Sequence, residues 1–177
     1  MKSILTSIRP RHVADILNGR KTIELRKTYP HCALPIDVYI YCTKGKDRLV
    51  WDIDGHICID NEHYAYGDEE LNGKVVARFW CDKVEPTNNF YEEEICSLAC
   101  ISKQEYFDYL GYDDGYAIHI TNLEIFDKPK ELSEFKVWGI DYPTGIIDPL
   151  HDCNVYYKKK LKPLTRAPQS WCYVEIE

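Results

Sequence analysis

The sequence predicts a single mixed α/β (α+β) domain, built on a small twisted β-barrel of five or six strands with two or three peripheral helices. Three observations favour this fold class. Apolar alternation of the strand type recurs more often than helical spacing. The strand-like segments are joined mostly by hairpin-length connections, not by the helical crossovers of parallel α/β folds. The 177 residues show no repeat or linker and are about the size of one domain.

The chain begins with a predicted strand and helix. Apolar residues at 4–8 indicate the first strand, and residues 10–18 place apolar side chains at the spacing of one helix face. Pro10 falls in the first turn of this helix, where its missing N–H is tolerated, and Gly19 is suited to the left-handed position that ends a helix. We therefore expect a short helix that leads directly into a second strand.

That second strand, residues 22–26, alternates polar and apolar side chains. Because successive strand residues point to opposite faces, Ile23 and Leu25 are expected to enter the core. On the opposite face we expect the polar side chains of Thr22, Glu24 and Arg26.

The rest of the chain continues the strand-rich pattern. Further strands are expected at residues 37–43, 49–51, 56–59, 73–84, 116–126 and 170–176. Ser102 and Glu105 form a capping box, which predicts a helix over residues 102–110 that buries Tyr106, Phe107 and Leu110. Loops are expected at residues 60–72, at 90–101 with its three consecutive glutamates, and at 138–168. The first and last strands should lie near each other.

The composition excludes several classes of protein. Hydrophobic residues make up 45% and aromatic residues 13% of the chain, which is typical of a folded domain rather than a disordered one. No apolar run approaches the roughly 18 residues of a membrane helix. The first apolar run is too short for a signal peptide. We therefore expect a cytoplasmic protein with no membrane partner.

The charge is unevenly distributed. The whole chain carries −7, which argues against indiscriminate binding to nucleic acid. Residues 1–30 carry +5, residues 31–157 carry −15 and residues 158–177 carry +3. If the termini meet in the fold, they form one basic face on an acidic body; the alternative is that each cluster is an ordinary solvated surface.

The eight cysteines do not form a Cys-x-x-Cys pair. The best metal candidates are the two His-x-Cys pairs, His56 with Cys58 and His151 with Cys153, but structural zinc sites usually show tighter paired spacings. We expect reduced thiols, no metal and no cofactor.

The most informative motif is G-x-K-x-x-E-x-R, formed by Gly19, Lys21, Glu24 and Arg26 directly after the first helix. Lysine and arginine can neutralise a phosphate or carboxylate, the glutamate can accept a hydrogen bond from an amino or hydroxyl group, and the guanidinium offers a planar fork. This predicts a ligand cleft. The alternative is an exposed strand face with an internal salt bridge of about 0.2–1 kcal/mol.

This motif resembles the ASCH family of PUA-like domains, and so do two further stretches, residues 115–126 and 168–175. The regions near residues 50–70 and 136–166 show no such resemblance. The resemblance implies one ASCH domain over residues 1–177, with a PUA-like barrel that binds RNA or a nucleotide, including one with a modified base.

Several other residues are candidates for the same ligand. The Gln169 amide can read the edge of a base, and the ring of Trp171 can stack on it, with Pro168 fixing the approach and Ser170 between them. Further contacts are expected around the cleft, from Arg9, Arg20, Lys27, Thr43, Lys44 and Lys158 to Lys160. The alternative for Trp171 is a core position in the last strand.

Two other functions remain open. Some ASCH proteins are similar to this one at Lys21 and remove an acyl group from the exocyclic nitrogen of cytidine; in those proteins a threonine nucleophile stands where Glu24 stands here. Thr22 is two residues away, so the resemblance to that branch is incomplete. A metal-free amidohydrolase that uses Lys21 and Glu24 as an acid–base pair is the second hypothesis, and a regulatory adaptor for a protein partner is the third. Binding without catalysis is the first.

Overall fold

The structure, a computed structural model, describes residues 3–29, 31–52, 54–60, 71–111, 113–141 and 158–176. The helices are α1 (Pro10–Leu17), α2 (Glu92–Ala99) and α3 (Lys103–Leu110), with 3₁₀ turns η1 (Thr87–Asn89) and η2 (Leu132–Glu134). The strands are β1 (Ser3–Ile8), β2 (Ile23–Arg26), β3 (Ile36–Cys42), β4 (Arg48–Trp51), β5 (Ile57–Asp60), β6 (Val75–Cys81), β7 (Val84–Pro86), β8 (Tyr116–His119), β9 (Thr121–Lys130), β10 (Phe135–Asp141), β11 (Lys158–Pro163) and β12 (Trp171–Ile176).

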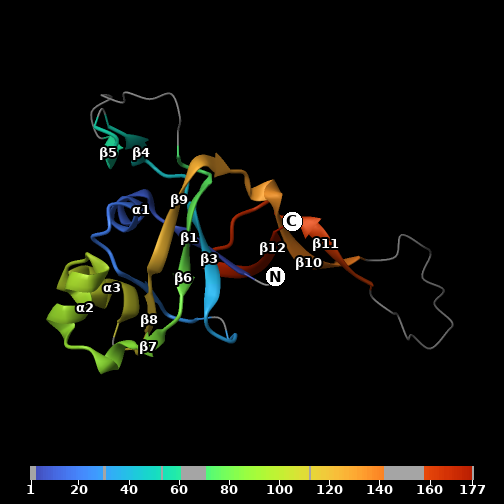
Figure 1. Cartoon of the computed structure of the whole chain (residues 1–177). Helices are drawn as coiled ribbons and strands as arrows, with labels where there is room; N and C mark the ends of the chain where they lie inside the picture. Colours follow the sequence, from blue (N-terminus) through green and yellow to red (C-terminus); the bar gives the residue numbers. More distant parts are fainter. Residues whose placement is uncertain are drawn as a thin grey trace, which may run out of the picture.

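A seven-stranded sheet forms the centre of the molecule, in the order β11-β10-β12-β1-β3-β6-β9 (Figure 1). The pair β1–β3 is parallel, because α1 and β2 intervene between the two strands, and the other pairs in this sheet are antiparallel. The first and last strands pair directly, with Ser3 opposite Val174 and Thr6 opposite Trp171. The expectation that the two ends of the chain meet is therefore confirmed.

The large sheet is buried on both faces around β1. One core cluster packs Ile4 and Ile8 of β1 against α1, β3 and β6. A second cluster, on the other side of the strand, packs Leu5 against Phe135 and Val174. Because β1 is covered on both faces, all six of its residues are buried, including the polar Ser7. The backbone of this buried strand forms one side of the candidate site.

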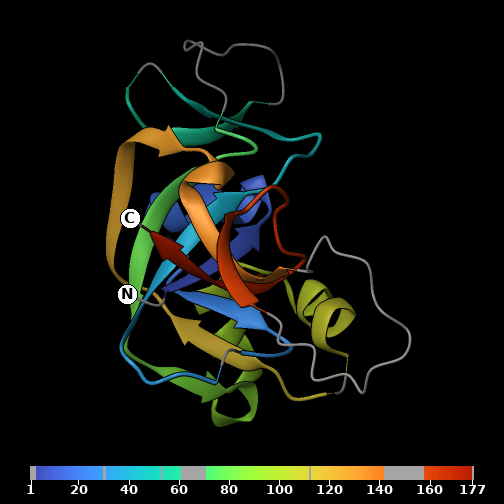
Figure 2. The same cartoon turned by 90° about the vertical axis from the view of Figure 1, so that its right-hand side faces the viewer.

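A separate three-stranded sheet, β2-β8-β7, holds the predicted motif strand. Its apolar side chains Ile23 and Leu25 pack with Ile95 and Ala99 of α2 and with Ala117 of β8. The helices α2 and α3 lie beside this sheet at one end of the molecule, whereas the β10–β11 hairpin lies at the other end, which faces the viewer in Figure 2. The motif strand is thus fixed between two helices and the large sheet.

The mixed α/β class is confirmed, but the closed five- or six-stranded barrel is not found in the described residues. The physical reason lies at Ile120. The segment predicted as one strand over residues 116–126 divides there, so that β8 joins the small sheet and β9 joins the edge of the large one. The strands are therefore shared between open sheets, and strands β4 and β5 form a third sheet, the predicted hairpin.

Residues 90–101, expected to be a loop, contain the helix α2. Its three glutamates occupy the first turn, where negative charge is stabilised by the helix dipole. The helix ends at Cys100, a non-glycine residue with a left-handed φ of 51°. The usual glycine signal for a helix end is therefore missing from the sequence.

Two smaller predictions also need correction. The capping box of α3 is present and Leu110 is buried, but Phe107 is 42% exposed and Tyr106 only half-buried. The predicted connection over residues 138–168 contains β11 and most of β10, paired as an antiparallel hairpin. None of the helices in the described ranges is long and apolar enough to cross a membrane.

Candidate ligand-binding cleft

A cleft of about 1450 Å³ opens between β2, the start of α1, α3, η2 and the segment before β12. Its basic lining residues are Arg9, Lys21, Arg26, Lys44 and Arg166, and its acidic ones are Glu24, Glu105, Asp108 and Glu131. The cleft therefore has nearly balanced charge, and it is not a uniformly basic groove. What distinguishes it is the arrangement of the charges at its floor.

The floor consists of the predicted motif residues Lys21, Glu24 and Arg26. Glu24 lies between the two bases: its Oε1 is 2.9 Å from an Arg26 guanidinium nitrogen, and its Oε2 is 3.3 Å from Lys21 Nζ. All three side chains are at least nine-tenths buried, with exposures of 3% for Lys21, 9% for Glu24 and 8% for Arg26. The motif is thus a buried charge network with one excess positive charge.

Lys21 is held by the ends of two helices. Its backbone N–H donates to Asp15 O near the end of α1, and its ammonium donates to Ala99 O, the last carbonyl of α2, at 2.9 Å. Carbonyls at a helix C-terminus lack partners within the helix and favour a cation. Helix α2, which the sequence analysis predicted to be a loop, therefore positions Lys21, which it predicted to contact the ligand.

Arg26 connects three parts of the chain at the floor. One terminal nitrogen contacts Glu24 and donates to Ser7 O of β1 at 2.8 Å, and the other donates to Ser170 Oγ at 3.3 Å. The cleft wall at residues 168–170 is fixed by β1 in turn, since Ser7 Oγ donates to Pro168 O and Ser7 N donates to Ser170 O. The distance from the floor to this wall is therefore set by β1.

Glu24 is held in its ionised form. Burial opposes ionisation of this carboxyl, but the positive charges of Arg26 and Lys21 lower its pKa below the ordinary value. Each carboxylate oxygen has two lone-pair sites, so both oxygens keep acceptor capacity beyond their contacts with Arg26 and Lys21. The floor thus presents a fixed anionic acceptor flanked by donors.

His12 of α1 also lines the cleft, and the sequence analysis missed it. Burial, and after it the positive charge of Lys21, lowers the pKa of this imidazole, so the ring is neutral near pH 7. Its Nδ1 and the Arg26 Nε are buried, and neither has a hydrogen-bond partner among the described residues. Buried polar groups without partners are uncommon, and these two lie on residues of the same cleft.

The rim contains most of the other predicted contacts. Arg9, Thr43, Lys44, Gln169 and Ser170 all line the cleft. The stem of Lys44 lies so close to Gly73 that a Cβ there would be 2.8 Å from Lys44 Cε, so a glycine at this position, with φ of +80°, leaves room for the lysine at the rim.

Solved structures resemble this fold. A serine-to-alanine variant of an ASCH protein from Zymomonas mobilis matches with a TM-score of 0.53 and 19% sequence identity, covering 73% of this chain and 74% of that chain. The ASCH protein itself matches with a TM-score of 0.50 and 19% identity over 73% of each chain. A tyrosine-to-phenylalanine variant gives 0.50 and 18%, over 75% and 77%. The chain has the ASCH fold.

The resemblance to the ASCH family is therefore confirmed as a resemblance of fold. No protein-family model and no curated protein matches the sequence. In this fold, the motif residues Lys21, Glu24 and Arg26 form the floor of the cleft.

Some predicted contacts lie outside the cleft. Arg20 forms two hydrogen bonds with Asp15 Oδ1, at 2.8 and 3.0 Å, and lines a separate surface hollow. Lys27 Nζ lies 5.6 Å above the ring of Tyr109. The described side chains of Lys159 and Lys160 are exposed on β11. Arg20 in particular is not brought together with the motif residues.

Trp171 lies on the far side of the Glu24–Arg26 pair. It lines an apolar cavity of about 20 Å³ between the two sheets, together with Tyr29, Cys32, Phe79 and other apolar side chains. Glu24 and Arg26 line both this cavity and the cleft. Trp171 is therefore a packing neighbour of the floor and does not stack over the open cleft.

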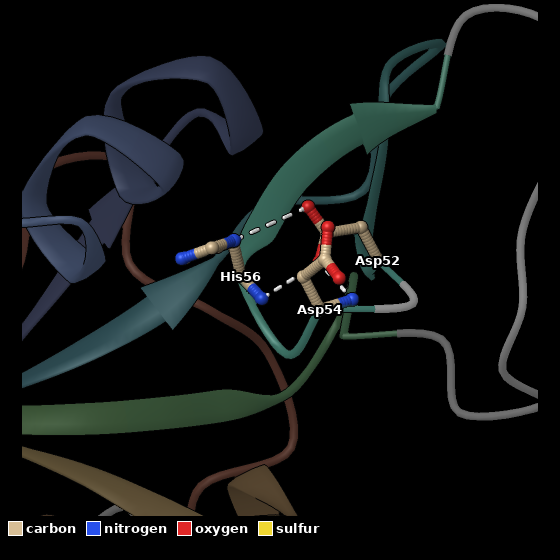
Figure 3. Close-up of side chains that lie close together, drawn as sticks. All are labelled: Asp52, Asp54 and His56. Atoms are coloured by element: carbon tan, nitrogen blue, oxygen red, sulfur yellow. Dashed lines mark hydrogen bonds and ion pairs between the residues drawn. The ribbon is translucent and has the colours of Figure 1, made fainter.

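The region of the first His-x-Cys pair shows a different grouping from the predicted one. His56 lies beside Asp52 and Asp54, and potential ligand atoms of the three are within 4.8 Å of one another (Figure 3). Asp52 Oδ1 accepts hydrogen bonds from the backbone N–H groups of Asp54 and His56, as expected of the turn between β4 and β5. The second pair, with Cys153, lies outside the described residues.

Proposed function

We propose that the cleft binds RNA or a nucleotide, with a base held against the floor of Lys21, Glu24 and Arg26. One observation carries this proposal: an ionised glutamate is buried between two cations at the bottom of an open cleft. Nucleobases present N–H donors beside carbonyl acceptors on one edge. A fixed carboxylate next to fixed N–H donors is complementary to such an edge, and hydrogen bonds to a charged group contribute about 1.5–3 kcal/mol each.

The polar atoms without partners support the same ligand class. The neutral His12 ring can donate or accept through Nδ1, depending on its tautomer, and Arg26 Nε can donate. A ligand that satisfies both atoms removes the cost of leaving them buried without partners. Gln169 on the opposite wall adds an amide that can read the edge of a base.

The balanced charge of the lining limits the footprint. Arg9, Lys44 and Arg166 are available for phosphate groups, whereas Glu105, Asp108 and Glu131 repel them. We therefore expect about three or four phosphate contacts and a shallow dependence of affinity on salt.

The arrangement of the floor residues favours ligand binding without catalysis. The Lys21 ammonium is engaged with Ala99 O and Glu24 and is therefore placed as a hydrogen-bond donor. Thr22 is exposed and does not line the cleft, so it does not replace the threonine nucleophile of the cytidine-deacylating branch.

The test is a panel of nucleosides, acylated cytidines and short RNAs, with binding followed by calorimetry and products by chromatography. We expect saturable binding without product, weakened about tenfold or more in Glu24→Gln and Arg26→Lys, the two variants that change the floor with least loss of volume. Arg20→Ala is the matched control, because this arginine is exposed and lies outside the cleft. Its affinity should equal that of the unmodified protein.

Two results would overturn the proposal. Product formed by the unmodified protein and abolished by Lys21→Ala would make the cleft the active site of an amidohydrolase. Failure of every member of the panel to bind, with all variants folded, would favour the adaptor hypothesis.

A further inference from the structure

The β10–β11 hairpin carries an exposed tryptophan that the core does not use. Trp138 is 55% exposed, whereas the other three tryptophans of the chain are half-buried. Its indole N–H donates to Glu175 Oε1 at 2.7 Å, which fixes the ring on the surface of the sheet. Large exposed aromatic rings held in one orientation are typical of binding surfaces.

The register shows which side chains share the face of Trp138. Trp138 pairs with Leu161, and Lys136 pairs with both Pro163 and Glu175. Because paired residues point to the same side and alternate residues share a face, Lys159 also lies on this face. The opposite face carries Phe135, which is fully buried in the core. Trp138 and its lysine neighbours therefore point away from the core.

The hairpin is strongly basic in an otherwise acidic protein. Its two strands contain five lysines and one aspartate, a net charge of +4, in a chain of net charge −7. A partner attracted to this hairpin must therefore be anionic. Lys136 and Lys159 share the face of Trp138 with Glu175, whereas Lys160 and Lys162 are on the opposite face. An aromatic ring on a basic hairpin fits a partner with both phosphates and bases, because stacking takes any base and lysines contact the backbone.

The chain runs directly from this hairpin into the wall of the cleft. Leu164 follows β11 immediately and lines the cleft, and its N–H donates to Phe135 O at the start of β10. Trp138 lies three residues along β10 from Phe135, about 10 Å at the rise of a β-strand. Leu164 packs with Phe135, so it is on the opposite face of the hairpin from Trp138. Because β11 is the edge strand of the sheet, an extended strand of nucleic acid passes around this edge to reach both the cleft and the tryptophan.

We propose that Trp138 and Lys159 form a stacking platform for single-stranded RNA whose first nucleotide occupies the cleft. This inference rests on the proposed function and extends it, since it makes the ligand an oligonucleotide and not a free mononucleotide. One base stacks on the indole ring, and Lys159 contacts the adjoining phosphate.

The test compares cytidine monophosphate with an oligocytidylate of about eight nucleotides, within the range that single-strand grooves cover. The oligonucleotide should bind more tightly and quench tryptophan fluorescence. Trp138→Ala should weaken its binding about five- to a hundredfold and abolish the additional quenching, while the affinity for the mononucleotide stays unchanged. Trp138→Phe should restore part of the affinity.

Matched controls lie in the same hairpin and elsewhere. Lys159→Ala should lower the slope of log affinity against log salt by about one. Lys160→Ala, one residue along on the opposite face, should change this slope less. Tyr91→Ala removes an aromatic ring that is 82% exposed next to the acidic first turn of α2 and should leave oligonucleotide binding unchanged.

The outcomes separate this inference from the proposed function. Equal affinity for the two ligands, or an unchanged oligonucleotide affinity in folded Trp138→Ala and Lys159→Ala, would overturn the platform while the Arg26-dependent binding of the mononucleotide stands. Oligonucleotide binding that depends on Trp138 but not on Arg26 or Glu24 would instead retain the platform and overturn the proposed function of the cleft. Loss of binding by Tyr91→Ala to the same extent as by Trp138→Ala would also contradict the assignment to the hairpin.

Discussion

Two glutamates that line the cleft, Glu24 at the floor and Glu105 at the rim, are each paired with an arginine, in opposite environments. At the floor, Glu24 and Arg26 are 2.9 Å apart with exposures of 9% and 8%. At the rim, Glu105 and Arg11 are 2.5 Å apart with exposures of 42% and 50%. The shorter distance belongs to the more exposed pair. Distance alone therefore does not show which pair contributes more to stability, and the two pairs must be compared by their burial.

Burial changes what each pair contributes. Exposed pairs typically contribute about 0.2–1 kcal/mol, because water screens the charges and the side chains lose freedom. A buried pair can be neutral overall against an apolar substitute, but removing one partner leaves an uncompensated buried charge. The floor is therefore costly to break, whereas the rim is tolerant. These two environments are consistent with a cleft that has a fixed floor and an adaptable rim.

The largest predicted effect is that of Glu24→Ala. With the carboxylate gone, Lys21 and Arg26 remain buried as two like charges at the floor. We expect the free energy of unfolding to fall by about 3–5 kcal/mol, as measured by urea denaturation. Glu105→Ala should cost much less, although it also removes the capping contacts with Ser102. Equal losses in the two variants would show that burial does not separate the pairs.

The second prediction concerns acid. The pKa of Glu24 is lowered in the folded state, so its stabilising contribution is present above the unfolded pKa of about 4.3 and is lost as the pH falls through the folded value. The stability of the unmodified protein should therefore decrease below about pH 4 more steeply than that of Glu24→Gln. The loss cannot exceed the cost of neutralising Glu24, so it is smaller than the first effect. Parallel curves for the two proteins would contradict it.

Glu105 gives the internal comparison for this pH dependence. Hydrogen bonds from Ser102 N–H, from the Arg11 guanidinium and from the Ser102 hydroxyl lower the pKa of Glu105 to about 2. The direction is the same as at Glu24, but the exposed side chain is screened by solvent. Glu105→Gln should therefore flatten the acid limb of the stability curve less than Glu24→Gln does.

Local patterns predicted the elements that carry the candidate site but not its environment. Pro10 and Gly19 fixed the ends of α1, and alternation over residues 22–26 fixed the strand after it. The same alternation placed Glu24 and Arg26 on a face opposite the core. In the structure that face is also covered, because the end of α2 and β1 supply carbonyls to Lys21 and Arg26. Alternation predicts which side chains share a face of a strand, but it does not predict which other segments cover that face.

The features that sequence reasoning missed depend on contacts between distant segments. His12 carries no motif and lines the cleft only because the fold brings α1 close to Lys21 and Glu24. Trp171 was predicted to stack on a ligand, but pairing of β12 with β1 places it at the inner cavity. The division at Ile120 depends on which sheet edges are free, and no local signal marks it.

The smallest predicted effect is that of Arg11→Ala at the rim. This substitution removes the ion pair with Glu105 but leaves the Ser102–Glu105 capping box in place. Because both side chains are well exposed, we expect a loss of about 0.2–1 kcal/mol in the free energy of unfolding, reduced further at high salt. Ligand affinity should change little, since Arg11 is not a lining residue of the cleft. A loss as large as that of Glu24→Ala would mean that the rim pair is rigid and desolvated, and the tolerant entrance inferred from its exposure would be wrong.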